Sequence, residues 1–552
     1  MFPPLLVVIL LVLVIVPVWQ SWRARVQLRA RIRAEWGHPR MITRDMEAVG
    51  DFFRSVPPGD GFIDDRTWAD LLMDSVFAQL DRTESSVGQQ ILYYRLRSAS
   101  APRNLHAFDA LITAVSGDPS RRERAQVALS RLRAPSVYYL HRLARQGGVD
   151  ELPRWYAVFP VWTGAALITM VLAFFWPKLI GAAVLCFIVN FAIRQLTARR
   201  LVSEIAWFRA VGPFLSVSSE LATLGGKETE EITGSLTSDL ARLKRLGAAM
   251  RWLSRDPTAV DPIAFALLEF LNVVFLLDTN ALYFGVGELL TQGPVLLKVI
   301  EIVGDIDAAI AVASFRKGSD GWIRPRFVQP EAPVMFANIC HPLVDHAVPN
   351  SIGLAPPHGV LITGSNMSGK STFLRTVGSN VVLAQSINTC LAGNYEAPIY
   401  SVRSCIGRAD DLVAGKSYYL VEVESVLALV KASTRATPHL FIFDELFRGT
   451  NAVERIAAAE AVLRELISKD KPHIVLAATH DGELVDLLRD NYSVYHFSDS
   501  VGPDGLVFDY RLQPGPATTR NAIALLRLSG ASESLVSRAL DLATALDQRK
   551  QL

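Results

Sequence analysis

The chain has 552 residues, more than one ordinary hydrophobic core organises, so we expect two or three domains. Half of its residues are hydrophobic, and its mean hydropathy of +0.25 is high for a purely soluble protein. A net charge of only +2 gives no argument for nucleic-acid binding, and four cysteines without paired or metal-ligand spacing exclude a disulfide framework and indicate a reducing compartment.

The first 22 residues predict a membrane anchor, because they contain no charged side chain and Leu5–Val18 is almost entirely leucine, valine and isoleucine. A cleaved signal peptide would begin with basic residues and end at small ones, and this segment does neither. The positive-inside rule places residue 23 onward in the cytoplasm. The rule applies because six arginines follow against one acid, Glu35: Arg23, Arg25, Arg29, Arg31, Arg33 and Arg40. These arginines also suit contact with lipid headgroups, with DNA contact as the alternative.

A second apolar block runs from Trp155 to Ile193 and predicts a transmembrane hairpin. Trp176-Pro177-Lys178 separates a first part long enough to span a bilayer from a shorter, uncharged second part, 179–193. Arginines flank the block on both sides, so both ends fit the cytoplasm. The alternative is a buried helical hairpin of a soluble domain. A third apolar run, Ile263–Leu277, contains Glu269 and has about 15 residues, a length that favours a buried core helix.

Two long stretches, 24–150 and 201–320, are predicted to be helical because apolar residues recur at three- and four-residue spacing, as at Leu72, Val76 and Leu80. Glycine and proline residues predict a linker near 317–332. From about residue 335, short β-rich runs alternate with helical stretches. Continuous apolar strands separated by helices predict a parallel sheet covered on both faces.

A glycine-rich loop follows the predicted strand 360–363 and precedes a helix. It fits the pattern G-x-x-x-x-G-K-[ST], in which glycines let backbone N–H groups surround phosphate oxygens. We therefore predict that Lys370 neutralises the β- and γ-phosphates of ATP and that the Ser371 hydroxyl ligates Mg²⁺. The predicted nucleotide-binding residues of this loop are Gly364, Ser365, Asn366, Met367, Ser368, Gly369, Lys370, Ser371 and Thr372.

Two other predicted strand ends supply acids and a histidine. Asp444 and Glu445 follow the strand 439–443. We predict that Asp444 holds Mg²⁺, directly or through water. Glu445 is predicted to orient or deprotonate the attacking water, because hydrolysis needs an acceptor in line with the γ-phosphate. His480 lies just after the strand 473–478, at the sheet edge where ligands bind, so we predict that it contacts the γ-phosphate.

These motifs resemble those of the DNA mismatch repair MutS family. Asn366-Met367 before Gly-Lys-Ser-Thr is similar to the family's phosphate loop, and 444–451 is similar to its Asp-Glu-x-x-Arg-Gly-Thr segment, with Phe447 in place of the usual glycine. Residues 406–417 resemble the family signature, which implies that Ser417 reaches the nucleotide of a partner subunit. His341-Pro342-Leu343 and Val348-Pro349-Asn350 resemble the segment that helps hold adenine, which implies a nucleotide contact for Val348.

The resemblance extends weakly upstream, where Leu80–Leu92 and Val303–Pro325 look like the two ends of the family's core and lever helices. Before residue 70 there is no room for the mismatch-reading and connector domains. We expect a multidomain protein with an α-helical core/lever region and transmembrane helices, followed by an α/β P-loop NTPase domain that is ABC-type and MutS-like. The expected segments are the anchor 1–22, the first core part 23–154, the hairpin 155–193, the second core/lever part 194–325 and the ATPase domain 326–552.

The resemblance implies an ATP hydrolase that uses Mg²⁺ and works as a homodimer with composite ATP sites. It also implies DNA, mismatched or damaged, as a partner. The apolar segments imply membrane lipid as a second partner. They place the protein in the inner (cytoplasmic) membrane, with the core and ATPase domains in the cytoplasm. One alternative is an ABC-type transport ATPase, although no Leu-Ser-Gly-Gly-Gln signature lies between the two nucleotide motifs. Another is a membrane scaffold or signalling ATPase that binds no DNA.

Overall fold

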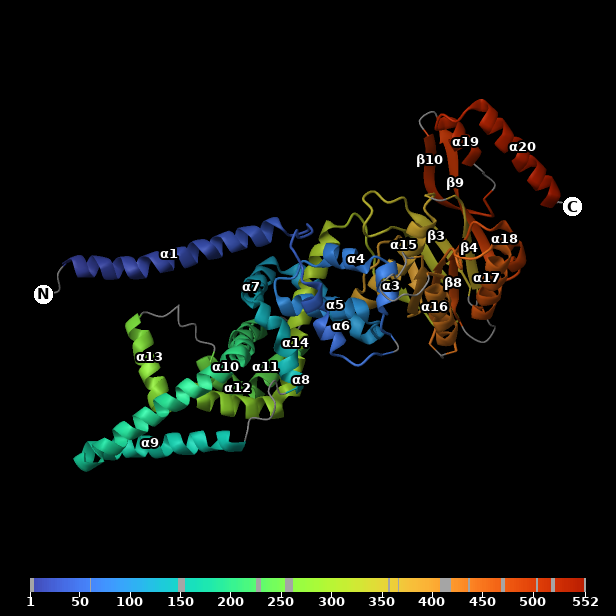
Figure 1. Cartoon of the computed structure of the whole chain (residues 1–552). Helices are drawn as coiled ribbons and strands as arrows, with labels where there is room; N and C mark the ends of the chain where they lie inside the picture. Colours follow the sequence, from blue (N-terminus) through green and yellow to red (C-terminus); the bar gives the residue numbers. More distant parts are fainter. Residues whose placement is uncertain are drawn as a thin grey trace. The chain divides into compact units, whose positions relative to one another are not determined.

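The computed structural model describes most of the chain, and Figure 1 labels its elements. The described residues are 4–59, 61–146, 154–224, 230–253, 262–355, 358–365, 367–407, 418–434, 437–467, 472–502, 505–517 and 522–550. The chain forms two compact units. The helical unit comprises Met1–Pro57, Leu80–Tyr94 and Ala107–Gly318; the sheet unit comprises Pro58–Gln79, Arg95–His106 and Ser319–Leu552.

The described elements of the helical unit are helices, as the apolar spacing predicts. They are α1 (Pro4–Ala34), α2 (Met46–Arg54), α7 (Pro119–Leu129), α8 (Leu140–Gln146), α9 (Val158–Phe175), α10 (Ile180–Ala222), α11 (Glu230–Arg242), α12 (Lys244–Leu253), α13 (Pro262–Phe275) and α14 (Leu277–Gly318), with short 3-10 turns η1 (Ser130–Leu132), η2 (Pro135–Tyr139), η3 (Arg154–Ala157) and η4 (Pro177–Leu179). Three further helices, α4 (Met73–Leu80), α5 (Ser86–Arg97) and α6 (Pro102–Gly117), have residues in both units.

The segment boundaries proposed from the sequence stay predictions, and the two units add detail to them. The chain leaves the helical unit between Gly318 and Ser319, a few residues before the expected start of the ATPase domain. Residues 58–79 and 95–106 belong to the sheet unit, although they lie within the expected core segment 23–154. Helix α10 continues without interruption past residue 193, where the hairpin was expected to end.

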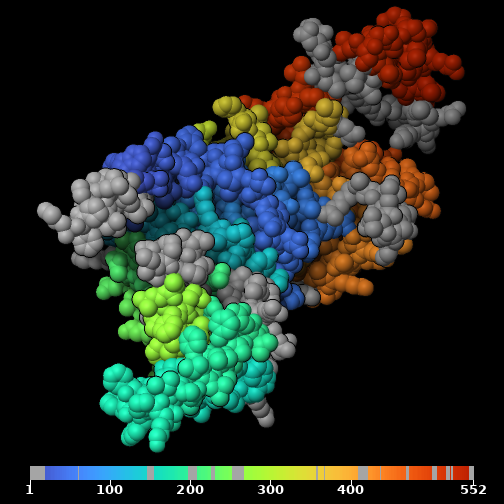
Figure 2. Space-filling model, turned by 60° about the vertical axis from the view of Figure 1, so that its left-hand side comes forward, coloured from blue at the N-terminus to red at the C-terminus, as the bar shows by residue number. Residues whose placement is uncertain are grey.

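The α9–α10 pair leaves its apolar side chains exposed. Two stretches, Trp155–Phe175 and Pro177–Leu196, are long and apolar enough to cross a membrane, with 21 and 20 residues. Only 17% and 6% of them is buried, so the pair is not a buried core hairpin of this chain. Figure 2 shows the pair in teal at the lower end of the molecule, next to α13 in light green.

Helices α5 and α14 approach closely in the core of the helical unit. A Cβ atom on Gly304 would lie 2.2 Å from Ile91 Cγ1, and one on Gly88 would lie 2.1 Å from Asp307 Oδ2. Only glycine fits both positions without a shift of the neighbouring helix. Asp307 in turn accepts hydrogen bonds from Ser85 N (2.8 Å) and Ser85 Oγ (2.6 Å), just before the first turn of α5.

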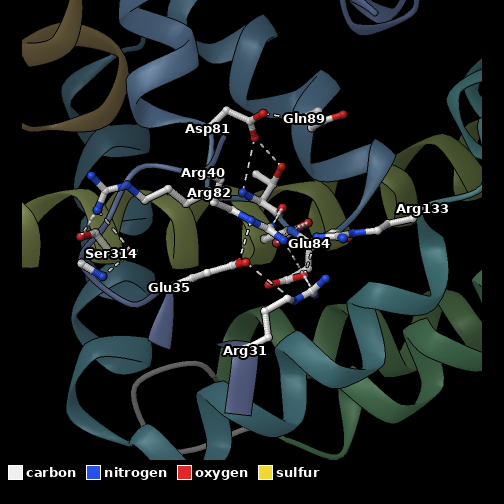
Figure 3. Close-up of polar contacts among 12 residues, drawn as sticks. Arg31, Glu35, Arg40, Asp81, Arg82, Glu84, Gln89, Arg133 and Ser314 are labelled. Atoms are coloured by element: carbon white, nitrogen blue, oxygen red, sulfur yellow. Dashed lines mark hydrogen bonds and ion pairs between the residues drawn. The ribbon is translucent and has the colours of Figure 1, made fainter. Parts of the chain in front are cut away.

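A buried carboxylate, Glu84, ties the end of α1 to this core (Figure 3). Only 2% of the Glu84 residue is exposed, and its Oε2 lies 3.1 Å from Arg31, 3.5 Å from Arg40 and 2.8 Å from Arg133. Arg31 belongs to α1, and the other two arginines come from separate connecting segments. Some of the arginines that follow the apolar N-terminal segment therefore serve the internal packing of the helical unit.

The sheet unit combines strands and helices, as predicted. Its elements besides α4, α5 and α6 are α3 (Asp65–Asp70), β1 (Arg326–Phe327), β2 (Val334–Ile339), β3 (Asn350–Leu354), β4 (His358–Thr363), α15 (Lys370–Ile387), β5 (Asn394–Ala397), β6 (Ser401–Ile406), α16 (Tyr418–Ala432), β7 (His439–Asp444), α17 (Ala452–Leu466), β8 (Ile474–Ala478), α18 (Gly482–Leu488), β9 (Tyr492–Gly502), β10 (Gly505–Pro514), α19 (Ala522–Leu528) and α20 (Glu533–Lys550).

The larger sheet has the strand order β10-β9-β4-β8-β7-β6. Strands β9, β4, β8, β7 and β6 are parallel, and β10 is antiparallel to β9. Side chains such as Phe441 and Phe443 pack with α16, α17 and α18 on one face. Ile442 points to the other face, where it approaches Gly378 of α15. A smaller sheet, β1-β5-β2-β3, completes the unit, which is therefore α/β with mixed sheets.

Helix α3 explains why residues 58–79 belong to the sheet unit. Asp70 accepts hydrogen bonds from Ser404 Oγ (2.8 Å) and Ile406 N (3.0 Å), both on the edge strand β6. Thr67 Oγ1 accepts another from Ser404 N (3.1 Å). Edge strands expose unpaired backbone groups, so α3 supplies side-chain partners that the sheet itself does not provide.

Candidate active site

The candidate active site lies at the carboxyl ends of three adjacent strands, β4, β8 and β7. Ile362 of β4 and Asp444 of β7 both pair with Ala478 of β8, so these strands end at the same level. Two backbone hydrogen bonds continue the alignment: Thr479 N donates to Ile362 O, and Glu445 N donates to Ala478 O, both at 3.0 Å. Ligands bind at this edge in parallel α/β sheets, so the register brings the three predicted motifs together.

The glycine-rich loop connects β4 to α15. Gly364 has φ +140° and Gly369 has φ +113°, which side-chain-bearing residues rarely adopt. A Cβ atom on Gly364 would also lie 2.8 Å from Phe497 O. Both glycines of the motif are therefore required by the local backbone. Met367, between them, has φ +72° and an exposed side chain.

Lys370 is the first residue of α15, and its ammonium group turns back onto the loop. Its Nζ donates to Gly364 O (2.9 Å) and Ser365 O (2.8 Å). Burial lowers the pKa of Lys370, while the carboxylates of Glu445 and Asp444 favour its charged form. The lysine is thus held where a cation can face an anion bound by the loop.

Ser371 and Asp444 meet across the site. Ser371 Oγ donates to Asp444 Oδ2 at 2.5 Å, which joins the start of α15 to the end of β7. Burial raises the pKa of Asp444, and the hydrogen bond from Ser371 partly offsets this shift. A hydroxyl and a carboxylate side by side are the oxygen ligands that Mg²⁺ prefers.

Glu445 lies beside a histidine and an arginine. Its Oε1 is 3.3 Å from His480 Nδ1, and its Oε2 is 3.3 Å from Arg448 Nη1. The Glu445 side chain is largely buried, whereas His480 and Arg448 are exposed. The structure thus places the predicted base next to the histidine predicted at the adjacent strand end.

A second ion pair supports this corner of the site and was not predicted from the sequence. Arg455, in the first turn of α17, makes two hydrogen bonds to Asp481, Nε to Oδ2 at 3.0 Å and Nη2 to Oδ1 at 2.6 Å. Asp481 is the residue after His480, and its Oδ1 lies 3.8 Å from His480 Nε2. The same hollow is lined by Glu445, Arg448, Arg455, His480 and Asp481. The one sequence feature that could have pointed to this pair is the position of Asp481 directly after the predicted His480.

Phe447 occupies the position at which the resemblance leads one to expect glycine. Its φ is +58°, in the left-handed region that favours glycine. Two contacts hold it there: its ring is buried, and its backbone N–H donates to Glu422 Oε1 at 2.5 Å. Glu445 has φ +52° as well, so the backbone after β7 is strained at the residue predicted to act as the base.

Val348 lies before β3, in the segment predicted to contact adenine. Its carbonyl accepts a hydrogen bond from Asn350 Nδ2 (3.2 Å), and the same amide donates to Tyr510 O (3.0 Å) on β10. Asn350 Oδ1 also accepts from Leu512 N (2.7 Å). The Tyr510 ring reaches 3.4 Å from the position of a Cβ atom on Gly369, so this segment is linked to the glycine-rich loop.

The structure therefore gathers most of the predicted site residues at one sheet edge, and their roles stay predictions. Ser368 is fully buried and Thr372 is exposed at the start of α15. Asn366 and Ser417 lie outside the described residues, as does most of the signature segment 406–417.

Comparison with known proteins agrees with this geometry. Residues 360–547 match the family model of MutS domain V. The DNA mismatch repair protein MutS of Thermus thermophilus is 33% identical over 251 residues, 45% of this chain and 30% of that protein. MutS of Streptococcus equi is 32% identical over 267 residues, 46% of this chain and 30% of that protein. The chain thus spans about 30% of the length of these curated relatives.

The fold, the strand-end site and the family match define the C-terminal region as a MutS domain V. By this region, the chain is a member of the MutS family. The family prediction made from the glycine-rich loop and the Asp444-Glu445 motif is therefore confirmed.

Proposed function

We propose that this protein is a membrane-anchored, MutS-like ATPase. The observation that carries the proposal is the convergence of Lys370, the Ser371–Asp444 pair and the Glu445–His480 pair at one sheet edge. A phosphate loop, a magnesium-binding pair and a base are the parts that ATP hydrolysis requires. All of them come from the region that matches MutS domain V.

The residues present fit Mg²⁺ and a nucleotide phosphate. Ser371 Oγ and the Asp444 carboxylate would hold the ion, which when bound neutralises charge on the phosphate oxygens. Ser368 Oγ is fully buried and has no hydrogen-bond partner among the described residues, so it suits a ligand oxygen at the loop. Lys370 would exchange its bonds to loop carbonyls for bonds to the β- and γ-phosphates.

Glu445 is proposed to act as general base. Its carboxylate takes a proton from the water that attacks the γ-phosphorus, while the bond between that phosphorus and the β–γ bridging oxygen breaks and ADP leaves. His480 Nδ1 holds one carboxylate oxygen and Arg448 the other, which fixes the base in one orientation. Arg455 and Asp481 hold the segment that carries His480.

We also propose that the protein works as a homodimer. The C-terminal helices α19 and α20 expose several leucines that water would solvate poorly in a lone subunit. These are Leu526, Leu528, Leu535, Leu540 and Leu542. In the proposed dimer, Ser417 of one subunit completes the ATP site of the other, as the resemblance implies. The dimer would make hydrolysis depend on protein concentration.

The membrane location is supported by the two apolar stretches, Trp155–Phe175 and Pro177–Leu196, which the chain leaves uncovered. We propose that they cross the inner membrane as a hairpin, that the apolar start of α1 crosses it as well, and that the rest faces the cytoplasm. Membranes washed with alkaline carbonate test this: the full chain should stay in the pellet and require detergent. Release into the carbonate wash would contradict it.

DNA is the proposed partner because the relatives are named as DNA mismatch repair proteins, and this remains a proposal since the chain covers only about 30% of them. The test is ATP turnover by the detergent-solubilised protein without DNA, with homoduplex and with mismatched duplex. Salt-sensitive stimulation by either duplex supports DNA coupling. Turnover that responds to neither would replace it with a membrane-signalling role for the same ATPase.

A further inference from the structure

Helix α13 contradicts the sequence prediction of a buried core helix. Leu267 is 59% exposed and Phe270 is 54% exposed, although both belong to one of the most apolar helices of the chain. The prediction was wrong because apolar composition and a 14-residue length do not distinguish a helix covered by protein from one covered by another apolar medium.

The helix packs against the exposed hairpin. The Phe270 ring lies 5.9 Å from that of Phe187 on α10, and Asn190 Nδ2 donates to Val274 O at 3.0 Å. Asn190 Oδ1 accepts from Trp162 Nε1 of α9 at 2.7 Å, so one buried amide joins α9, α10 and α13. The apolar surface of α13 is therefore continuous with that of the hairpin, as the neighbouring teal and light green atoms of Figure 2 show.

The one charged side chain of α13 is neutralised by a residue of the hairpin helix α10. Glu269 is the only ionisable residue between Pro262 and Phe275, and it forms an ion pair with Arg194 of α10. Arg194 follows the apolar part of α10 and precedes the basic stretch that ends the hairpin. A paired carboxylate at that level can lie next to the polar headgroups while the phenylalanine and leucine side chains face away from water.

We propose that α13 enters the cytoplasmic leaflet beside the hairpin as a further membrane helix that does not span the bilayer, with lipid acyl chains as the partner of Leu267 and Phe270. At about 1.5 Å per residue the helix is about 21 Å long, shorter than the hydrocarbon core. This inference rests on the proposed membrane location of the hairpin. It adds a lipid-contacting surface that neither the apolar N-terminal segment nor the hairpin accounts for.

The same helix connects directly to α14, which carries Asp307 in the core of the helical unit. The turn between them is held by Asn272, which accepts from Asp278 N (3.0 Å) and donates to its carboxylate (2.5 Å). Asn280 Nδ2 adds a bond to Thr163 Oγ1 of α9 (3.1 Å). The start of the long helix α14 therefore lies beside the hairpin.

The test uses the full chain in liposomes, with its four cysteines replaced and a nitroxide spin label attached at Leu267→Cys or Phe270→Cys. Ile168→Cys on α9 serves as the reference for the membrane interior, and Leu487→Cys on α18 as the reference for water; both native side chains are exposed. Collision of each label with oxygen, which concentrates in the bilayer, is compared with collision with a water-soluble nickel chelate.

Labels at 267 and 270 should show an oxygen-to-nickel collision ratio several-fold above that at 487 and close to that at 168. A ratio like that at 487 would place α13 in water and overturn the inference. Protection from both reagents would mean that protein covers α13, which also overturns it. If the label at 168 itself collides with nickel, the proposed membrane location of the hairpin fails, an outcome distinct from failure at α13 alone.

Discussion

The two units of this protein both bury charged side chains, but they neutralise them differently. In the sheet unit, Asp444 ends β7, Glu445 follows it and Lys370 begins α15, and the register of β4, β8 and β7 brings them together. In the helical unit, Glu84 is surrounded by Arg31, Arg40 and Arg133 from three separated segments. The groups at the strand ends lie at an open sheet edge that a ligand can reach. The groups around Glu84 pair with one another inside the helical unit.

This difference indicates different uses of buried charge. A site that binds a charged ligand needs groups that the protein only partly satisfies, such as Ser368 Oγ at the loop. In the structural cluster, three arginines of the same unit neutralise the buried carboxylate of Glu84 (Figure 3). Substitutions in the sheet unit should therefore change catalysis more than folding, and substitutions in the cluster the reverse. The following predictions test that contrast.

The largest effect on nucleotide binding is expected for Lys370→Ala. Removing the ammonium group from the loop should weaken nucleotide binding at least about 100-fold, or about 2.7 kcal/mol, because Lys370 is the cation that contacts the loop carbonyls of Gly364 and Ser365. Equilibrium binding of a fluorescent ATP analogue measures this. Lys431→Ala, at an exposed lysine in the last turn of α16, is the matched control. Equal affinities in the two variants would remove the loop from the nucleotide site.

Glu84→Gln should destabilise the protein by about 3–5 kcal/mol, because three guanidinium groups lose their buried anion. Urea unfolding in detergent measures the free energy of unfolding. Glu123→Gln removes the acid of an exposed ion pair with Arg33 and should cause no resolvable change. If the two variants proved equally stable, the cluster would not be a structural element.

Arg455→Gln should lower ATP turnover about tenfold, corresponding to about 1.4 kcal/mol of activation free energy, with little change in KM. The reason is that Arg455 orients the segment of His480 through Asp481 and does not touch the nucleotide loop. Asp481→Asn should have the same effect, and the double variant should be no slower than either single one. Additive losses would show that the two residues act separately.

The last of these predictions concerns pH. Burial raises the pKa of Asp307 from its ordinary value of 3.8 to about 7 in the folded protein. Between these values the folded protein retains a proton that the unfolded chain releases, so the free energy of unfolding should fall as the pH rises from about 4 to 7 and then level off. Asp307→Asn should flatten this part of the Tm–pH curve. An unchanged curve would exclude Asp307 as its cause.

Sequence patterns predicted the sheet unit well, because its chemistry follows local rules. A glycine-rich loop after one strand and two acids after a later strand single out Lys370, Ser371 and Asp444 in the sequence, and the structure brings these residues together; their roles stay predictions. The Arg455–Asp481 pair could not be assigned, since neither residue belongs to a motif and their contact depends on how α17 packs against α18.

The helical unit was less predictable because its specific contacts join distant residues. Apolar spacing predicted helices, but not that Asp307 accepts hydrogen bonds from Ser85 before α5 or that Arg40 reaches Glu84. The length of the run 263–277 favoured a buried core helix, but it did not show that Glu269 in this run pairs with Arg194, far earlier in the chain. The spacing of apolar residues and the composition of a helix do not show which distant residue its charged side chain pairs with.

Release of inorganic phosphate from Mg²⁺-ATP by the purified full chain tests the central claim most directly. The wild-type protein should hydrolyse many ATP molecules per subunit, and Glu445→Gln should bind ATP yet release phosphate at least about 100-fold more slowly. Glu465→Gln, at an exposed acid of α17, should behave like wild type. Wild-type release no faster than that of Glu445→Gln would contradict the assignment of this sheet edge as an ATP-hydrolysing site.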